Sequence, residues 1–205
     1  HVLLAIKNID RMGGAQRAVT ELANELITRE YKVIVAGVMD TTRNKYHLDQ
    51  NCALLNLNDW FSNDQTQNRL LIKLRNTLTK IIKKMLQRQS WWIKYGCSVE
   101  AWSKLIREVE PDIIISSLPN TFVPLSLAVR KIGIPNIIYN HSNPWQDYSL
   151  DRYESNPQDL KYRLEALEYA SINIVLQPEF KNFFSRSVQS KTFVIPNIVR
   201  SIPRS

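Results

Sequence analysis

The chain has 205 residues, 44% of them hydrophobic, which is enough for one sizeable core and too short for two full α/β domains. Its two cysteines, Cys52 and Cys97, lack the spacing of a disulfide framework or a zinc site, so a reducing, cytoplasmic environment is expected. The longest uncharged apolar run, residues 113–129, contains two prolines, and no leader precedes His1. We therefore expect no membrane span and no signal peptide. The chain does not begin with methionine, so we expect that its true start lies upstream or was trimmed.

The first 38 residues predict a strand, a glycine turn, a helix and a second strand. Residues 2–6 and 33–38 are short aliphatic runs, typical of buried parallel strands. Between them, apolar residues recur at helical spacing from Ala15 to Ile27, with charged residues on the other side. The pair Gly13 and Gly14 stands where this amphipathic helix begins.

Strands and helices continue to alternate along the rest of the chain. Further strands are expected at 52–57, 111–117, 134–140, 171–177 and 191–197. Helices are expected up to Glu110 and over 122–133 and 159–169, with one or two helical turns over 179–187. This alternation predicts an α/β fold with a doubly wound, mostly parallel sheet of about seven strands. Ligands bind such sheets outside the carboxyl ends of the strands.

Several kinds of chemistry lack their motifs. The sequence has no GxxxxGK[ST], no GxGxxG, no GxSxG and no HExxH, which disfavours P-loop, dinucleotide-binding, serine hydrolase and zinc protease functions. It also has no Asp-x-Asp pair to hold a divalent ion against a nucleotide diphosphate. With only three histidines, at positions 1, 47 and 141, we expect no essential metal and no other cofactor.

The paired glycines are the strongest positive feature. Two adjacent residues without Cβ let the backbone approach a ligand closely, and the free N–H groups of a first helical turn suit a phosphate or another anion. The alternative is a tight strand-to-helix turn that needs a positive φ. From the residues alone the two interpretations are equally good.

The net charge of +8 comes from one segment. Residues 66–99 hold eight of the 27 basic residues and no acidic one, so 19 basic residues face 19 acidic ones elsewhere. A helix predicted over 70–94 has an apolar face and a basic face, with aromatic residues at its end; the residues concerned are Lys73, Lys80, Lys83, Lys84, Arg88, Lys94, Trp91, Trp92 and Tyr95. This pattern favours an anionic membrane surface. An ordinary solvated face and a nucleic-acid contact are the alternatives, and no nucleic-acid motif accompanies the charge.

Four segments, in order, resemble family 4 glycosyltransferases of GT-B fold. They are GGAQRAVTELANELITREYKVIVAGV from residue 13, PDIIISSLPNT from 111, IPNIIYNHSN from 134 and KTFVIPNIV from 191. The family pattern near the first is GGAERxxxxLAxxLxxxGHxVxV. The resemblance implies that residues 1–205 form the Rossmann-like N-terminal, acceptor-side domain. It also implies a C-terminal, donor-binding domain that this chain does not contain, so the chain alone should be inactive.

The resemblance also implies roles for particular residues. Gly13 and Gly14 match the loop that approaches the donor diphosphate and the reacting sugar. His141 matches a histidine that contacts the transferred sugar, which makes it the catalytic candidate, and a histidine that caps a strand-end loop is the alternative. The neighbouring candidates for donor or acceptor contacts are Asn120, Thr121, Asn140 and Ser142. Two departures from the family bear on acceptor identity: Ser116 and Ser117 replace a common histidine, and Gln16 replaces the usual glutamate.

Together these features and the resemblance predict a glycosyltransferase at the inner face of the cytoplasmic membrane. That it is a retaining enzyme is implied by the resemblance alone. The expected partners are a nucleotide-diphosphate sugar, a saccharide or lipid-linked acceptor such as those of lipid-linked oligosaccharide or capsular polysaccharide synthesis, and an anionic membrane. A non-catalytic membrane-docking subunit that joins a separate donor-binding chain, and a basic nucleic-acid-binding domain, are the alternatives.

Overall fold

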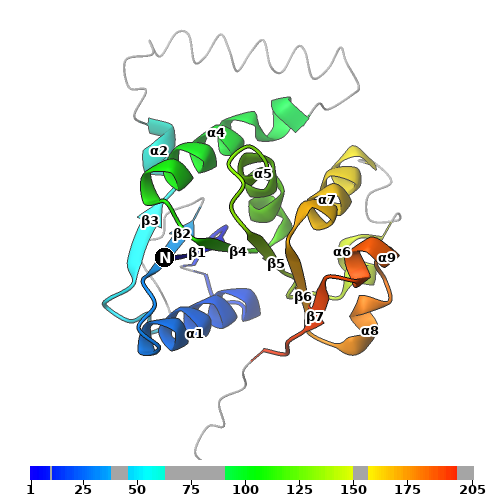
Figure 1. The fold of residues 1–205 in the computed structure, drawn as a ribbon, viewed down its shortest axis with the longest axis horizontal. Coiled ribbons are helices and arrows are strands. Elements are labelled where there is room, and N and C mark those ends of the chain that lie inside the picture. The colour runs from blue at the N-terminus through cyan, green and yellow to red at the C-terminus, as the bar shows by residue number, and fades with distance from the viewer. Residues whose placement is uncertain (10, 38–45, 63–90, 150–156, 198–205) are drawn as a thin grey trace, which may run out of the picture.

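A computed structural model describes residues 1–9, 11–37, 46–62, 91–149 and 157–197 (Figure 1). Its centre is a seven-stranded sheet in the order β3-β2-β1-β4-β5-β6-β7, with every neighbouring pair parallel. The strands are β1 (Val2–Ile6), β2 (Val33–Gly37), β3 (Ala53–Asn56), β4 (Ile113–Ser117), β5 (Asn136–Tyr139), β6 (Ile172–Val175) and β7 (Thr192–Val194). The predicted α/β fold and its seven strands are confirmed.

Helices cover both faces of the sheet (Figure 1). They are α1 (Gly14–Thr28), α2 (Asn58–Ser62), α4 (Trp91–Val109), α5 (Pro119–Val129), α6 (Pro144–Asp147), α7 (Pro157–Tyr169), α8 (Pro178–Lys181) and α9 (Arg186–Gln189). The short helices α2 and α6 were not predicted. Helix α5 begins three residues earlier than predicted, because a proline is tolerated in the first turn of a helix.

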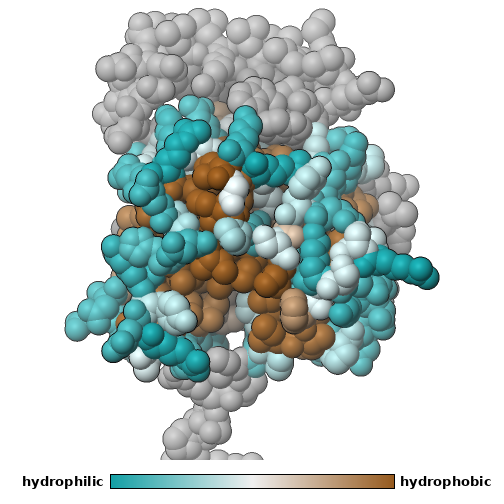
Figure 2. All heavy atoms as spheres, viewed as in Figure 1, coloured by the Kyte–Doolittle hydropathy of each residue, from teal (hydrophilic) through white to brown (hydrophobic). Residues whose placement is uncertain are grey.

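The strand alternation divides the core into two layers. On β1, Leu3 and Ala5 pack in the layer that contains α4, α5 and α7, whereas Val2, Leu4 and Ile6 pack in the layer that contains α1. The side chain of Trp102, in the middle of α4, is 0% exposed. Figure 2 shows hydrophobic side chains in the centre of one face, between helices whose outer surfaces are hydrophilic. The sheet is therefore held from both sides, and its strand ends are left for the loops.

The strand order reverses direction between β1 and β4. From β1 the chain proceeds outward through β2 to β3, and it then returns to build β4 to β7 on the other side. In doubly wound sheets this reversal opens a crevice at the carboxyl ends of the two central strands, because the loops that follow them turn to opposite faces. The loops after β1 and β4 are thus the first places to look for a ligand site.

Candidate functional site

The predicted site residues after β1, β4 and β5 lie on one edge of the sheet. Ile6, at the end of β1, pairs with Ser117 at the end of β4, and Ser117 pairs with Tyr139 at the end of β5. Neighbouring strands lie about 4.8 Å apart, so the ends of β1 and β5 are separated by roughly 10 Å. The glycine turn and the His141 loop therefore flank the same short stretch of sheet edge, with β4 between them.

The glycine turn has extended rather than left-handed backbone. Gly13 is the N-cap of α1 with φ −178° and ψ 160°, a conformation that any residue adopts, so the interpretation that the pair needs a positive φ is wrong. The Gly13 N–H donates to the Tyr46 hydroxyl over 3.1 Å, and that hydroxyl donates to the Gly13 carbonyl over 3.2 Å. In this structure a tyrosine thus covers the amide that the sequence assigns to a ligand.

The two glycines differ in what a side chain would meet. A Cβ on Gly13 would lie 2.4 Å from Oε1 of Gln16. The Gln16 side chain is fixed there, because its Nε2 donates to the carbonyl of Asn8 over 3.0 Å. A Cβ on Gly14 would meet nothing within 4 Å. Gly13 therefore serves the turn itself, whereas Gly14 leaves open space beside the sheet edge.

His141 is held as a neutral imidazole. Its Nε2 lies 3.0 Å from the Ser117 hydroxyl, and its ring stacks at a tilt on Tyr139 with centroids 4.2 Å apart. Burial lowers the pKa of His141 to about 4, and an interaction with the Asn197 side chain opposes that shift only in part. Its Nδ1 is buried without a hydrogen bond of good geometry. At neutral pH the ring is a hydrogen-bonding group without charge.

Two polar side chains fix the backbone around His141. The Tyr139 hydroxyl bonds the carbonyl of Ile195 at 3.2 Å and Oδ1 of Asn197 at 3.1 Å, which ties the segment after β7 to this edge. The Asn140 amide donates to the Ile174 carbonyl over 3.2 Å and accepts from the Tyr148 hydroxyl over 2.6 Å. Asn140, predicted to contact a ligand, thus directs its side chain into the fold.

The other predicted contacts divide by exposure. Asn120 is exposed in the first turn of α5, and Ser142 is half-buried in the loop between β5 and α6. Thr121 is 0% exposed, and its Oγ1 has no hydrogen-bond partner, so it presents no surface to a ligand in this conformation. Leu118, the N-cap residue of α5, has φ 71° and ψ 135°, a conformation that L-residues rarely adopt. Leu118 therefore places a strained backbone conformation directly after β4.

The predicted membrane-facing residues fall mainly outside the described part of the chain. Lys73, Lys80, Lys83, Lys84 and Arg88 are not described, and of Trp91 and Trp92 only the backbone is, in the first turn of α4. Tyr95 is described, and its expected place among interfacial aromatic residues is wrong. It is 6% exposed, and its hydroxyl donates to Asp159 over 2.6 Å, because α4 turns this residue toward α7.

The described residues also bear on the predictions about membranes and metals. Among the helices that the structure describes, none combines the length and the apolar character that a membrane span requires. No group of three His, Cys, Asp or Glu side chains in the described ranges is arranged to hold a metal ion. The predicted independence from metals stays a prediction.

Two contacts at the site were not predicted from the sequence. They are the hydrogen bond between Ser117 and His141, and those between the Tyr46 hydroxyl and the backbone of Gly13. Ser117 was noted only as a departure from a family pattern. Ser117 is the last residue of a predicted strand, at the edge where the loop after the next strand also lies. That position is a signal that could have placed it near His141. Tyr46 carries no such signal, since it lies 33 residues from Gly13.

A seven-stranded parallel sheet with helices on both faces and a switch point defines a Rossmann-like α/β domain. The model of Glycosyltransferase Family 4 matches residues 12–201, so the chain belongs to that family. The comparison with curated proteins gives no match.

Solved structures with the same fold include enzymes of nucleotide-sugar chemistry. MurG of Acinetobacter baumannii is 13% identical with a TM-score of 0.57, over 98% of this chain and 46% of that one. Anabaena Alr3699/HepE, solved in complex with UDP and glucose, is 14% identical with a TM-score of 0.54, over 96% and 44%. A UDP-GlcNAc 2-epimerase from Methanocaldococcus jannaschii is 14% identical with a TM-score of 0.55, over 96% and 46%.

At these identities the likeness shows the fold alone. The chain spans less than half the length of each of these structures. The presence of an epimerase among them means that the fold serves more than one reaction, so the reaction has to be argued from the family and from the site.

Proposed function

We propose that this chain is the acceptor-side part of a retaining glycosyltransferase. The enzyme moves a sugar from a nucleotide-diphosphate donor to a hydroxyl of a saccharide or lipid-linked acceptor, with no essential metal. Membership of glycosyltransferase family 4 supports the reaction class. A second domain supplies the grip on the nucleotide, so the 205-residue chain by itself does not transfer sugar.

One observation carries the proposal: the glycine turn, Ser117 and His141 share the carboxyl edge of three adjacent parallel strands. The open space at Gly14 lets a sugar or a diphosphate come close to the start of α1. The positive end of the α1 dipole favours the negative charge that develops on the leaving diphosphate. Bond breaking would therefore occur over the switch point.

In this proposal His141 orients a sugar hydroxyl as a neutral group. Ser117 fixes Nε2, which leaves Nδ1 as the nitrogen for the ligand. Nδ1 is buried in this conformation beside the segment 195–197, which the Tyr139 hydroxyl binds, so the proposal requires that segment to move when the ligand enters. Because the pKa of His141 is about 4, the ring contributes a hydrogen bond rather than a proton at neutral pH. We assign no catalytic base.

The test is sugar transfer by the natural full-length protein, assayed with a panel of nucleotide-sugars and acceptors. Variant Gly14→Val should lose transfer because its side chain occupies the donor's space. Variant His141→Ala should retain donor binding and transfer at least about tenfold more slowly, the effect of one lost hydrogen bond in the transition state. Parental rates in both variants would refute the site, and no transfer by the parent with any pair would refute the function.

The membrane assignment belongs to the same proposal and is tested separately. The basic segment 66–99 supports it through its charge, and each cation near an anionic surface contributes about 1 kcal/mol of attraction. The protein should sediment with phosphatidylglycerol vesicles at low salt and not with phosphatidylcholine vesicles, and Lys83→Glu with Lys84→Glu should abolish sedimentation. Equal binding to both kinds of vesicle, or binding to duplex DNA instead, would contradict it. Vesicle binding without sugar transfer would favour the docking-subunit alternative.

A further inference from the structure

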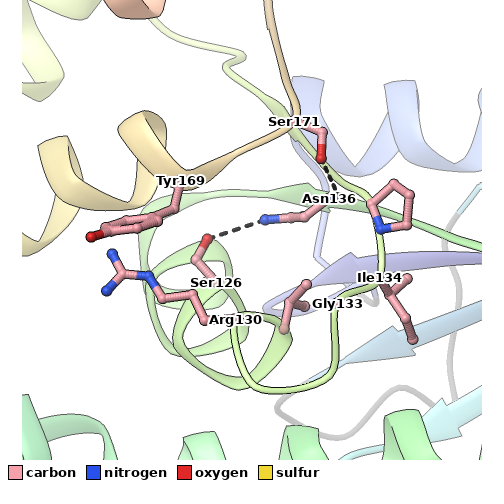
Figure 3. A pocket seen from close by; sticks show the side chains of 9 residues that line it. Ser126, Arg130, Gly133, Ile134, Asn136, Tyr169 and Ser171 are labelled. Carbon is pink, nitrogen blue, oxygen red and sulfur yellow. Dashed lines mark hydrogen bonds between the residues drawn. The ribbon is translucent and has the colours of Figure 1, made fainter.

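A cavity lies at the edge of the sheet opposite to the candidate site, where strands β5 and β6 begin. It has a volume of about 480 Å³ and is formed where α5 ends, where β5 begins and where α7 meets β6 (Figure 3). Its lining includes Ser126, Arg130, Ile134, Tyr169 and Ser171. The cavity therefore touches no residue of the glycine turn or of the His141 loop. Its size falls within the range of small-molecule sites.

Asn136 forms the polar floor of this cavity, and its side-chain amide is already hydrogen-bonded at both ends. It is 3% exposed, and its Nδ2 donates to the Ser126 hydroxyl over 3.1 Å while its Oδ1 accepts from Ser116 over 3.2 Å. Its backbone N–H donates to the Ser171 hydroxyl over 3.3 Å. Figure 3 shows both serine side chains turned toward Asn136 from two different elements.

Both serine hydroxyls accept a hydrogen bond here and donate none to another described group. A hydroxyl that accepts from Asn136 still has its own O–H to donate. Ser126 and Ser171 therefore bring two unused donors to the same floor. No Asp or Glu is among the described residues that line the cavity.

Arg130 adds a positively charged donor at the wall. Its guanidinium lies over the Tyr169 ring, with Cζ 2.9 Å from the ring centroid, which is a cation–π contact. Within the described ranges Arg130 forms no ion pair. Burial lowers its pKa, while Tyr169 and Glu165 act on it through space in the opposite direction. The contact with Tyr169 thus positions the guanidinium, whose planar group carries several N–H donors for a ligand.

We propose that this cavity binds a small organic oxyanion, a carboxylate or phosphate group carried on a compact apolar body. Arg130 holds the oxyanion with its N–H edge, and the hydroxyls of Ser126 and Ser171 donate to the remaining oxygens. Val129, Ile134 and Pro135 provide the apolar walls. The site is separate from sugar transfer and goes beyond the proposed function.

Isothermal titration calorimetry of the purified protein tests this site with inorganic phosphate, benzoate, phenyl phosphate and the uncharged analogue benzamide. Phenyl phosphate and benzoate should bind saturably and more tightly than inorganic phosphate, since they also cover the apolar walls, and benzamide should not bind. Arg130→Gln should weaken phenyl phosphate binding at least about tenfold. The affinity of Arg130→Lys for phenyl phosphate should lie between those of the parent and Arg130→Gln, because lysine keeps the positive charge and lacks the planar guanidinium.

The matched control is Lys131→Gln, which removes the same charge from the next residue, an exposed side chain outside the cavity. Its affinity should stay within about twofold of the parent, because screened surface charges act weakly at a distance. An equal loss in Lys131→Gln and Arg130→Gln, or no saturable binding by the folded parent, would overturn the proposal. Circular dichroism of each variant reports its folding, and Arg130→Lys provides the readout if Arg130→Gln is unfolded.

Discussion

The two adjacent glycines should respond in opposite ways to the same substitution. In Gly13→Ala the new methyl group would lie 2.4 Å from Gln16 Oε1, so the Gln16 side chain has to leave its place. That movement breaks its 3.0 Å hydrogen bond to the Asn8 carbonyl, and a neutral hydrogen bond contributes about 1 kcal/mol to the free energy of unfolding. Alanine also limits the unfolded chain, which offsets about 0.4–1 kcal/mol of this loss, so we expect Gly13→Ala to lower the free energy of unfolding by up to about 0.6 kcal/mol.

In Gly14→Ala the methyl group meets nothing within 4 Å, and the residue is the first of α1. Alanine limits the unfolded chain more than glycine does, so the free energy of unfolding should rise by about 0.4–1 kcal/mol. The same methyl group protrudes into the space assigned to the donor. Gly14→Ala should therefore combine unchanged or higher stability with slower sugar transfer.

The assay is urea unfolding of the two variants, followed by circular dichroism and repeated in a Gln16→Ala background. Without the glutamine amide, Gly13→Ala should raise the free energy of unfolding as Gly14→Ala does. The coupling energy of the cycle should then be about 1 kcal/mol, the contribution of the broken hydrogen bond. The effect of Gly14→Ala should not depend on residue 16. Equal destabilisation by both alanines, or a cost of Gly13→Ala that persists without Gln16, would refute this account of the turn.

Three further predictions concern the His141 edge. His141 has a folded-state pKa of about 4, below its unfolded value, so its protonation favours unfolding. The free energy of unfolding should fall as the pH drops from 6.5 toward 4, and the total loss once the ring is protonated in both states is at most about 3 kcal/mol. In His141→Asn, the free energy of unfolding from urea titrations should depend less on pH over this range. Asn140→Ala removes the side-chain hydrogen bonds to the Tyr148 hydroxyl and to the Ile174 carbonyl, which keeps the backbone N–H of residue 140. We expect a loss of about 1–3 kcal/mol in thermal unfolding, and an unchanged melting temperature would contradict the bonding described. Ser117→Ala should lower kcat with little change in the KM for the donor, because it frees the His141 ring rather than removing a donor contact, and steady-state kinetics distinguish this from a rise in KM alone.

The regular part of the fold could be predicted because its signal is local. Short aliphatic runs bounded by polar residues mark all seven strands, and their alternation with helices fixes a parallel sheet. Helices α2 and α6 were missed because five and four residues are too few to show a helical period. Tyr95 was misplaced because its neighbours in sequence suggested an interface, whereas its partner Asp159 lies 64 residues away.

The candidate site could be located from the sequence but not assembled. The edge of the sheet follows from the strand order, so the glycine turn and the His141 loop were expected together. Which side chains face the ligand depends on hydrogen bonds between distant residues. Asn140 turns inward to Ile174 and Tyr148, while Ser117 at the end of β4 contacts His141 after the neighbouring strand β5, and no residue pattern reports either choice.

The central claim is that sugar transfer occurs at the carboxyl edge of this sheet. Hydrogen–deuterium exchange of the natural full-length protein, with and without the nucleotide-sugar that it transfers, tests the claim most directly. The account predicts slower exchange of the backbone amides of residues 13–17, 118–121 and 141–143 when the donor is bound. Protection of residues 30–33 and 133–136 at the opposite edge, with the carboxyl edge unchanged, would contradict it.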